Sequence, residues 1–276
     1  MLRIGPSGNS LSFYESGHKH TYEAAKWVSE LGLNAFEYSF GRGVIMGDTA
    51  AEKIKSAFAA YDIEISAHAP YFTNFSNPSD DKISNSVGYV SQAIAAVKKM
   101  GGKRVVFHPA SCGGMDRKEA VLIAMRNIDN MMSALNGDFI LCPETMGKFN
   151  QIGTVEETVE FCKLDPRLIP CYDFGHINSY TRGGLKGYED YKKIIEYTFE
   201  HLGEYKTKNM HIHFSKIMYG AKGELKHLTF ADTKYGPEYA PLAKVIDEYS
   251  LDAFIVCESN GTMAEDALAM KSMHSR

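Results

Sequence analysis

The sequence lacks several features that define other classes of protein. It contains no C-x-x-C pair, no apolar run of membrane-spanning length, no low-complexity segment and no linker. Its five cysteines, an odd number in dissimilar surroundings, favour buried thiols in a reducing compartment over a disulfide framework. The start of the chain reaches Gly5 and Pro6 too soon for a signal sequence. We therefore expect one cytoplasmic domain spanning residues 1–276, with no membrane contact.

An excess of positive charge is also missing. Lysine and arginine number 30 against 34 aspartates and glutamates, which gives a formal net charge of −4. This balance argues mildly against a nucleic-acid partner, because phosphate contacts need local cations. Metal ions bound to clustered carboxylates would, however, make a site more positive than its side chains indicate.

Short apolar runs alternate with amphipathic stretches of helical length. The apolar runs, which predict strands, are Leu2–Ile4, Ala35–Tyr38, Ile63–Ala67, Arg104–Phe107, Phe139–Cys142, Leu168–Tyr172, Met210–Phe214 and Phe254–Cys257. The stretches that predict helices are Tyr22–Leu31, Thr49–Ala60, Lys82–Met100, Arg117–Leu135, Val155–Cys162, Tyr188–Leu202, Tyr239–Tyr249 and Ala264–Met273. This alternation predicts an α/β fold, a single (β/α)8 TIM barrel. A doubly wound open sheet fits less well, since the segment after the first run lacks G-x-G-x-x-G spacing.

Side chains that commonly bind metals follow six consecutive predicted strands. They are His68, His108, Glu144, Asp173 with His176 three residues later, His211 and Glu258. One histidine at a strand end is more often a hydrogen-bonded residue than a ligand. In a parallel barrel, however, the ends of all six strands would meet at one rim. Burying so many imidazoles and carboxylates together would cost free energy without a cation. The pattern therefore predicts a metal cluster at the carboxyl-terminal ends of the strands.

The mixture of donors limits the metal and the chemistry. Imidazoles together with carboxylates favour zinc, manganese or iron over magnesium or calcium. The donors outnumber those that one tetrahedral ion uses, which indicates two or more ions and a bridging carboxylate. Such clusters suit the hydrolysis of phosphate esters.

The ordered strand-end segments resemble the successive motifs of the endonuclease IV family. These segments are Ser66–Tyr71, Val106–Pro109, Pro143–Thr145, Asp173–His176, Met210–Lys216 and Cys257–Glu258. Members of that family are xylose-isomerase-like barrels that cleave DNA at abasic sites. The resemblance implies a zinc-dependent hydrolase of DNA repair, an AP endonuclease, whose partner is DNA containing abasic sites. It implies two or three zinc ions, with manganese as an alternative; we expect a monomer and no protein partner.

The resemblance also implies a role for each residue. One zinc would be held by His68, His108 and Glu144, and a second by Glu144, Asp173, His211 and Glu258. A third zinc would be held by His176. The family's Asp-x-His pair at this site is replaced here by Glu224 and His227. His213 is a substitute ligand at a position where the family usually has Asn. Glu144 would orient or deprotonate the attacking water. Substrate contacts would come from Tyr71, Arg182 and Lys216, and Arg42 is the candidate DNA-penetrating residue.

Two other functions remain open. In a sugar isomerase or epimerase, Glu144, Asp173, His211 and Glu258 would hold a single ion, and two carboxylates would move a proton beside a carbonyl. The spare imidazoles, His68 and His108, would then bind substrate hydroxyls. The third hypothesis is a barrel without enzymatic activity that keeps its metal as a structural module or to bind damaged DNA.

Overall fold

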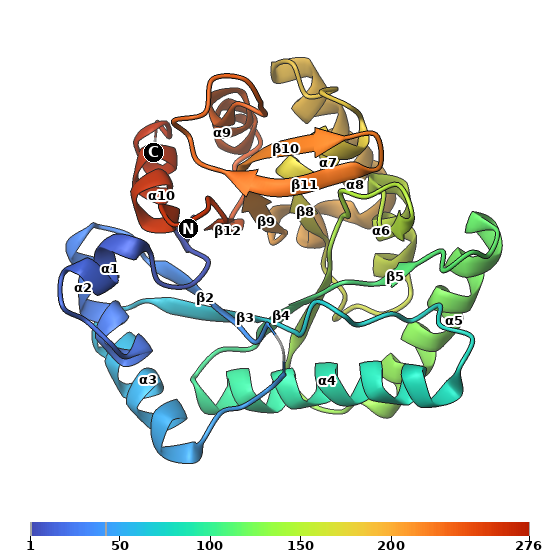
Figure 1. The fold of residues 1–276 in the computed structure, drawn as a ribbon, viewed down its shortest axis with the longest axis horizontal. Coiled ribbons are helices and arrows are strands. Elements are labelled where there is room, and N and C mark those ends of the chain that lie inside the picture. Colours follow the sequence, from blue (N-terminus) through green and yellow to red (C-terminus); the bar gives the residue numbers. More distant parts are fainter. Residues whose placement is uncertain (1, 42, 276) are drawn as a thin grey trace.

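A computed structural model of the chain describes residues 2–41 and 43–275. Across these residues, eight parallel strands close into a barrel with helices on its outside (Figure 1). In order along the chain and around the barrel, the strands are β1 (Arg3–Pro6), β2 (Ala35–Ser39), β3 (Glu64–His68), β4 (Arg104–Phe107), β6 (Ile140–Pro143), β8 (Cys171–Asp173), β9 (His211–Phe214) and β12 (Phe254–Cys257). Single bridges from Ser7 to Glu37 and from Glu144 to Cys171 join the two four-stranded halves. The predicted TIM barrel is confirmed, while Arg42 lies outside the described residues.

Helices follow the strands where the amphipathic stretches predict them. They are α2 (Ala24–Glu30), α3 (Asp48–Ala60), α4 (Asp80–Lys99), α5 (Arg117–Ala134), α6 (Val155–Lys163), α8 (Tyr188–Lys208), α9 (Tyr239–Glu248) and α10 (Met263–Ser272). Polar side chains fix some of their starts: Thr154 and Glu157 form a capping box at α6. In the part of the chain that the structure describes, no helix is both long enough and apolar enough to cross a membrane.

Further helices and strands lie at the carboxyl-terminal end of the barrel. Two short helices, α1 (Leu11–Glu15) and α7 (Phe174–Tyr180), begin soon after β1 and directly after β8. The pair β5 (Ala110–Ser111) and β7 (Gln151–Ile152) is antiparallel, as is the hairpin of β10 (Lys216–Gly220) and β11 (Gly223–Leu228). In Figure 1 the β10–β11 hairpin lies beside α7, over the end of the barrel. It contributes side chains to the site described below.

Along β9, strand alternation sends polar side chains into the barrel interior. On β9, Ile212 and Phe214 pack in the hydrophobic core, with the Phe214 ring 4.9 Å from that of Tyr239 on α9. The alternate residues, His211 and His213, face the interior and are fully buried. Buried polar groups are costly unless they are paired, so the interior must satisfy them with one another or with a cation.

Candidate metal centre

Three histidines at the barrel rim have the same orientation. His68 ends β3, His108 directly follows β4, and His176 lies in the first turn of α7. The Nδ1 atoms of His68, His108 and His176 lie 2.6, 2.7 and 2.9 Å from backbone carbonyl oxygens. Because a carbonyl oxygen can only accept a hydrogen bond, each Nδ1 carries the proton, which leaves Nε2 free to act as a metal ligand.

Glu144, directly after β6, is the carboxylate at which the rim histidines meet. Its Oε2 atom lies 3.1 Å from Nε2 of both His68 and His108, and its Oε1 atom lies 3.0 Å from Nδ1 of His213. Burial would raise the pKa of Glu144, but His213, His108 and His68 hold the pKa well below its ordinary value. The carboxylate is therefore ionised, with its two oxygens directed at different groups of donors.

A second group of donors joins Glu144 and His213 to Asp173, at the end of β8, and Glu258, directly after β12. Each of these four side chains offers an atom within 4.8 Å of the others. The Oδ2 atom of Asp173 is buried, and no described residue donates a hydrogen bond to it. Burial also raises the pKa of Asp173. A divalent cation here would satisfy this oxygen, which accepts no hydrogen bond from the described residues, and would keep the carboxylate ionised.

The β10–β11 hairpin brings a third group of donors to the same aspartate. Asp173, His176 and His227 offer atoms within 4.8 Å of one another, and Glu224 Oε2 lies 3.4 Å from His176 Nε2. Gly147 makes this approach possible, because a Cβ atom there would lie 2.9 Å from both Glu224 Cβ and the His176 ring. Glu144 thus belongs to the first and second groups of donors, and Asp173 belongs to the second and third.

Two of the rim imidazoles, those of His68 and His176, carry extra protons when no cation is bound. Burial would lower the pKa of His68, but Glu144 raises it to about 9. Burial would likewise lower the pKa of His176, and Asp173 and Glu224 raise it to about 9. These protons balance the buried carboxylates, and a divalent cation could replace them. The residues offer nitrogen and oxygen donors, and the buried Asp173 oxygen accepts no hydrogen bond within the described part of the chain, so they fit divalent metal ions.

His211, predicted as a ligand, lies one layer deeper than the rim. Its Nε2 atom lies 3.2 Å from Glu37 Oε2, and burial lowers the pKa of His211 to about 4. His213, two residues further along β9, is the histidine that joins Glu144, Asp173 and Glu258. The structure therefore brings together all the predicted metal ligands except His211.

The predicted substrate-binding residues lie in three different environments. Tyr71 is exposed and lines the cavity at the rim. Lys216 is buried, and its Nζ atom donates to the Asp232 carbonyl at 2.7 Å and pairs with Glu238 at 2.9 Å. The Arg182 guanidinium stacks over the Phe149 ring at 5.0 Å. Of the three, only Tyr71 lines the cavity.

That cavity has a volume of about 310 Å³ and is bounded by the histidines and carboxylates of the rim together with residues that the sequence analysis missed. The missed residues are Ser39, Met146, Lys148 and Gln151. Among the described residues of its lining, Lys148 is the one lysine or arginine. Glu37, also missed, lies beneath the cavity, and a lone carboxylate inside the apolar run Ala35–Tyr38 could have drawn attention to it.

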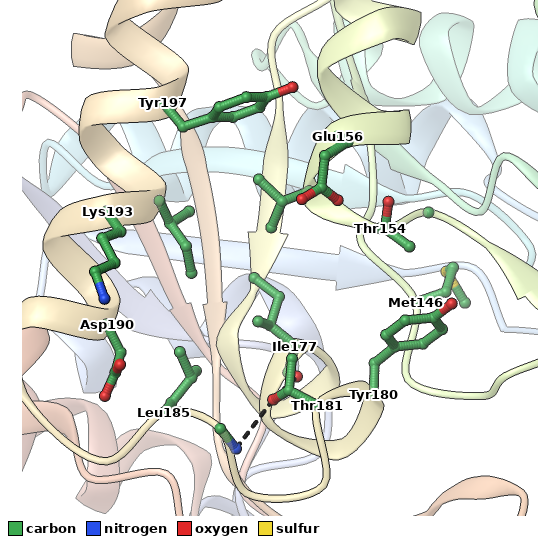
Figure 2. Close-up of a pocket in the computed structure, with 14 residues that line it drawn as sticks. Met146, Thr154, Glu156, Ile177, Tyr180, Thr181, Leu185, Asp190, Lys193 and Tyr197 are labelled. Atoms are coloured by element: carbon green, nitrogen blue, oxygen red, sulfur yellow. Dashed lines mark hydrogen bonds between the residues drawn. The ribbon is translucent and has the colours of Figure 1, made fainter.

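A larger cavity of about 510 Å³ lies outside the barrel, between the start of α6, α7 and α8 (Figure 2). Its lining is mainly apolar and includes Ile177, Leu185 and Tyr197, and Met146 borders both cavities. None of the histidines and carboxylates of the rim lines it among the residues that are described. The chemistry of the molecule is therefore concentrated at the smaller cavity.

Comparison of the sequence with known proteins gives matches over most of the chain. A family model described as a xylose isomerase-like TIM barrel matches residues 25–274. An uncharacterised protein of Methanocaldococcus jannaschii is 32% identical over 98% of this chain and 96% of its own length. A probable endonuclease 4 of Malacoplasma penetrans is 27% identical, but the match covers only 63% of this chain and 61% of that protein.

Similar solved structures include proteins with different activities. Endonuclease IV from Thermus thermophilus superimposes with a TM-score of 0.66 at 16% identity, covering 92% of this chain and 93% of that one. A D-tagatose 3-epimerase-like protein gives a TM-score of 0.65 at 17% identity, covering 90% and 89%. At these identities, the likeness shows the fold alone.

Proposed function

Because the chain belongs to the xylose isomerase-like TIM-barrel family, we propose that it is a metal-dependent hydrolase that cleaves DNA at abasic sites. The observation that carries this proposal is that three groups of donors are linked, the first to the second by Glu144 and the second to the third by Asp173. One tetrahedral ion uses four ligands, whereas ten candidate ligand side chains were predicted and nine of them lie at the rim. Such a surplus supports two or three ions, zinc being the element that best suits these donors.

Divalent ions held by these residues would lower the pKa of a water molecule and stabilise charge on the leaving oxygen of a phosphodiester. Glu144 is the residue we assign to orienting and deprotonating the attacking water, since it is ionised and lies at the centre of the donor groups. Lys148 would contact the phosphate, and the exposed Tyr71 ring would pack against the sugar or base beside the abasic site.

The test is cleavage of a duplex oligonucleotide with one abasic site by the zinc-loaded protein. We expect a nick at the abasic site, no cleavage of the undamaged duplex, and loss of activity with a chelator. Glu144→Gln should lower the rate by roughly 10²–10⁴-fold. Glu160→Gln, which changes an exposed carboxylate on α6, is the matched control and should be fully active. If the zinc-loaded protein leaves the abasic duplex intact, the proposal is wrong.

A single-metal sugar epimerase is the second candidate. It is favoured by the group of Glu144, Asp173, His213 and Glu258, which could complete one ion, and by a cavity large enough for a monosaccharide. The number of ions separates the candidates. About one zinc per chain would favour the epimerase, and two or three would favour the hydrolase.

A further inference from the structure

Glu37 is a fully buried carboxylate on β2, directly beneath the rim. Its Oε1 atom lies 3.0 Å from His213 Nε2, and its Oε2 atom lies 3.2 Å from His211 Nε2. The Ser66 hydroxyl donates a hydrogen bond of 2.9 Å to Oε2. Glu37 thus faces two imidazoles and one hydroxyl inside the barrel, and it lines neither the rim cavity nor the larger outer cavity.

His213 is oriented in the opposite way from the other rim histidines. His68, His108 and His176 place Nδ1 against a backbone carbonyl and direct Nε2 to the rim. His213 instead directs Nδ1 to the rim, 3.0 Å from Glu144 and 3.6 Å from Glu258. Its Nε2 atom has no aligned hydrogen-bond partner among the described residues, and the polar atom beside it is the Glu37 oxygen.

We propose that Glu37 is the positioning residue for His213: it keeps the proton on Nε2 and so leaves Nδ1 as the metal-binding atom. The reason is electrostatic. A lone pair on Nε2 would face the lone pairs of the Glu37 carboxylate oxygen at 3.0 Å in the buried interior, and that arrangement is repulsive. Outer carboxylates fix the tautomer of metal-binding histidines in this way. Glu37 does for His213 what backbone carbonyls do for the other three.

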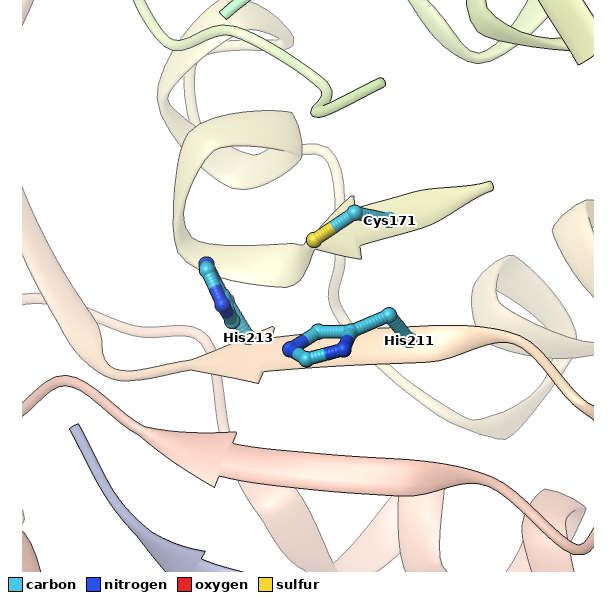
Figure 3. Close-up of side chains that lie close together, drawn as sticks. All are labelled: Cys171, His211 and His213. Atoms are coloured by element: carbon cyan, nitrogen blue, oxygen red, sulfur yellow. The ribbon is translucent and has the colours of Figure 1, made fainter. Parts of the chain in front are cut away.

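A rival arrangement uses the same histidine differently. Cys171, His211 and His213 are buried, offer atoms within 4.8 Å of one another, and project from β8 and β9 into one space (Figure 3). An ion there would need a nitrogen of His213, but its Nδ1 faces the rim carboxylates and its Nε2 faces Glu37. The observations therefore favour Glu37 as the partner of His213.

The first experiment measures zinc affinity by competition with a chelator. We expect Glu37→Gln to weaken the binding of one ion by about 10- to 100-fold. Ser66→Ala is the matched control, because it removes a hydrogen bond to the same carboxylate without touching His213, and its affinity should match that of the wild type. Equal affinity in Glu37→Gln and the wild type would overturn the proposal.

The second experiment needs no substitution at Glu37, so it stands even if that variant does not fold. Two-bond ¹H–¹⁵N spectra of the zinc-loaded wild type should show His213 protonated at Nε2 and bound through Nδ1. Binding through Nε2 would contradict the proposal. So would a thiolate-to-metal absorption in the cobalt-loaded protein that disappears in Cys171→Ser and persists in Cys142→Ser, a change at another buried thiol.

The inference rests on the rim metal site of the proposed function, but not on DNA cleavage. If the wild-type protein binds no zinc, both the proposed metal site and this inference are wrong. A protein that binds zinc but cleaves no abasic DNA would overturn the proposed reaction and leave the role of Glu37 intact. The zinc titration therefore tests the metal site and the role of Glu37, and the cleavage assay tests the proposed reaction.

Discussion

The rim of the barrel and the layer beneath it use the same residue types for different purposes. His213 and His211 lie two residues apart on β9 and both contact Glu37. Burial would lower the pKa of His213, but Cys171, Glu258, Glu37 and Glu144 raise it well above its ordinary value, whereas burial lowers the pKa of His211 to about 4. One step of strand alternation, about 7 Å along the chain, separates a histidine that contacts Glu144 and Glu258 as well as Glu37 from one that contacts Glu37. We therefore expect depth in the barrel, as well as residue type, to decide which imidazole binds a metal.

The strongest test of this comparison removes each histidine in turn. His213→Ala should lower the zinc content by about one ion per chain, because it removes a donor from the group with Glu144, Asp173 and Glu258. His211→Ala should retain the zinc and instead reduce the free energy of unfolding by roughly 2–3 kcal/mol, since it leaves the Glu37 carboxylate short of a partner. Metal analysis and urea unfolding measure the two effects. Equal loss of zinc in both variants would break the distinction between the layers.

A second test separates the hairpin from the rest of the rim. His227→Asn should remove one ion, the one that Asp173 and His176 share with the hairpin, and leave the ions at Glu144 in place. We expect two zinc ions per chain to become about one, or three to become about two. His201→Asn is the control, because that side chain lies on α8 outside the barrel and contacts the Tyr197 carbonyl. Full zinc content in His227→Asn would mean that β11 supplies no ligand.

The same contrast between layers explains what the sequence could predict. The barrel could be predicted from the alternation of apolar runs and amphipathic stretches. This alternation reflects which side chains are buried and depends little on the exact residue at each position. The strand ends also brought His68, Glu144, Asp173 and Glu258 to one rim. In contrast, the choice between His211 and His213 depends on where β9 ends relative to β8, and in the structure His213 pairs in register with Asp173. An H-x-H pattern alone places both rings on the same face of the strand and cannot give that register.

Other parts of the site depend on contacts between distant segments. Lys148 reaches the cavity because the loop after β6 pairs with the hairpin, through a bridge from Lys148 to Gly223. Lys216 lies two residues after the end of β9, yet its ammonium group is directed to Asp232 and Glu238. Loop conformations of this kind leave no periodic pattern in the sequence. The positions of the Lys148 and Lys216 side chains could therefore not be predicted from residue spacing.

The protonation of the rim gives a smaller effect that depends on pH. The pKa of His68 and His176 is raised from 6.5 to about 9, so each stabilises the metal-free fold fully below pH 6.5 and loses that contribution as pH rises through 9. The metal-free protein should therefore become less stable between pH 7 and pH 9.5. With zinc bound, the ions replace these protons and the decline should be shallower. Urea midpoints with chelator and with zinc measure both curves, and parallel curves would show that the rim protons and the ions do not exchange.

The smallest expected effect concerns the positive charge at the edge of the rim cavity. Lys148→Met should weaken binding of an abasic duplex by about 10-fold and lower the salt dependence by about one ion per complex, because one phosphate contact is lost. The rate of cleavage at saturating DNA should change little, since Lys148 is not among the metal-binding side chains. Lys216→Met is the matched control: its ammonium group is held by Asp232 and Glu238, so its loss should reduce stability and leave the salt dependence unchanged. If Lys216 rather than Lys148 governs the salt dependence, the DNA follows a path on the far side of the hairpin, and the rim cavity is better suited to a small sugar.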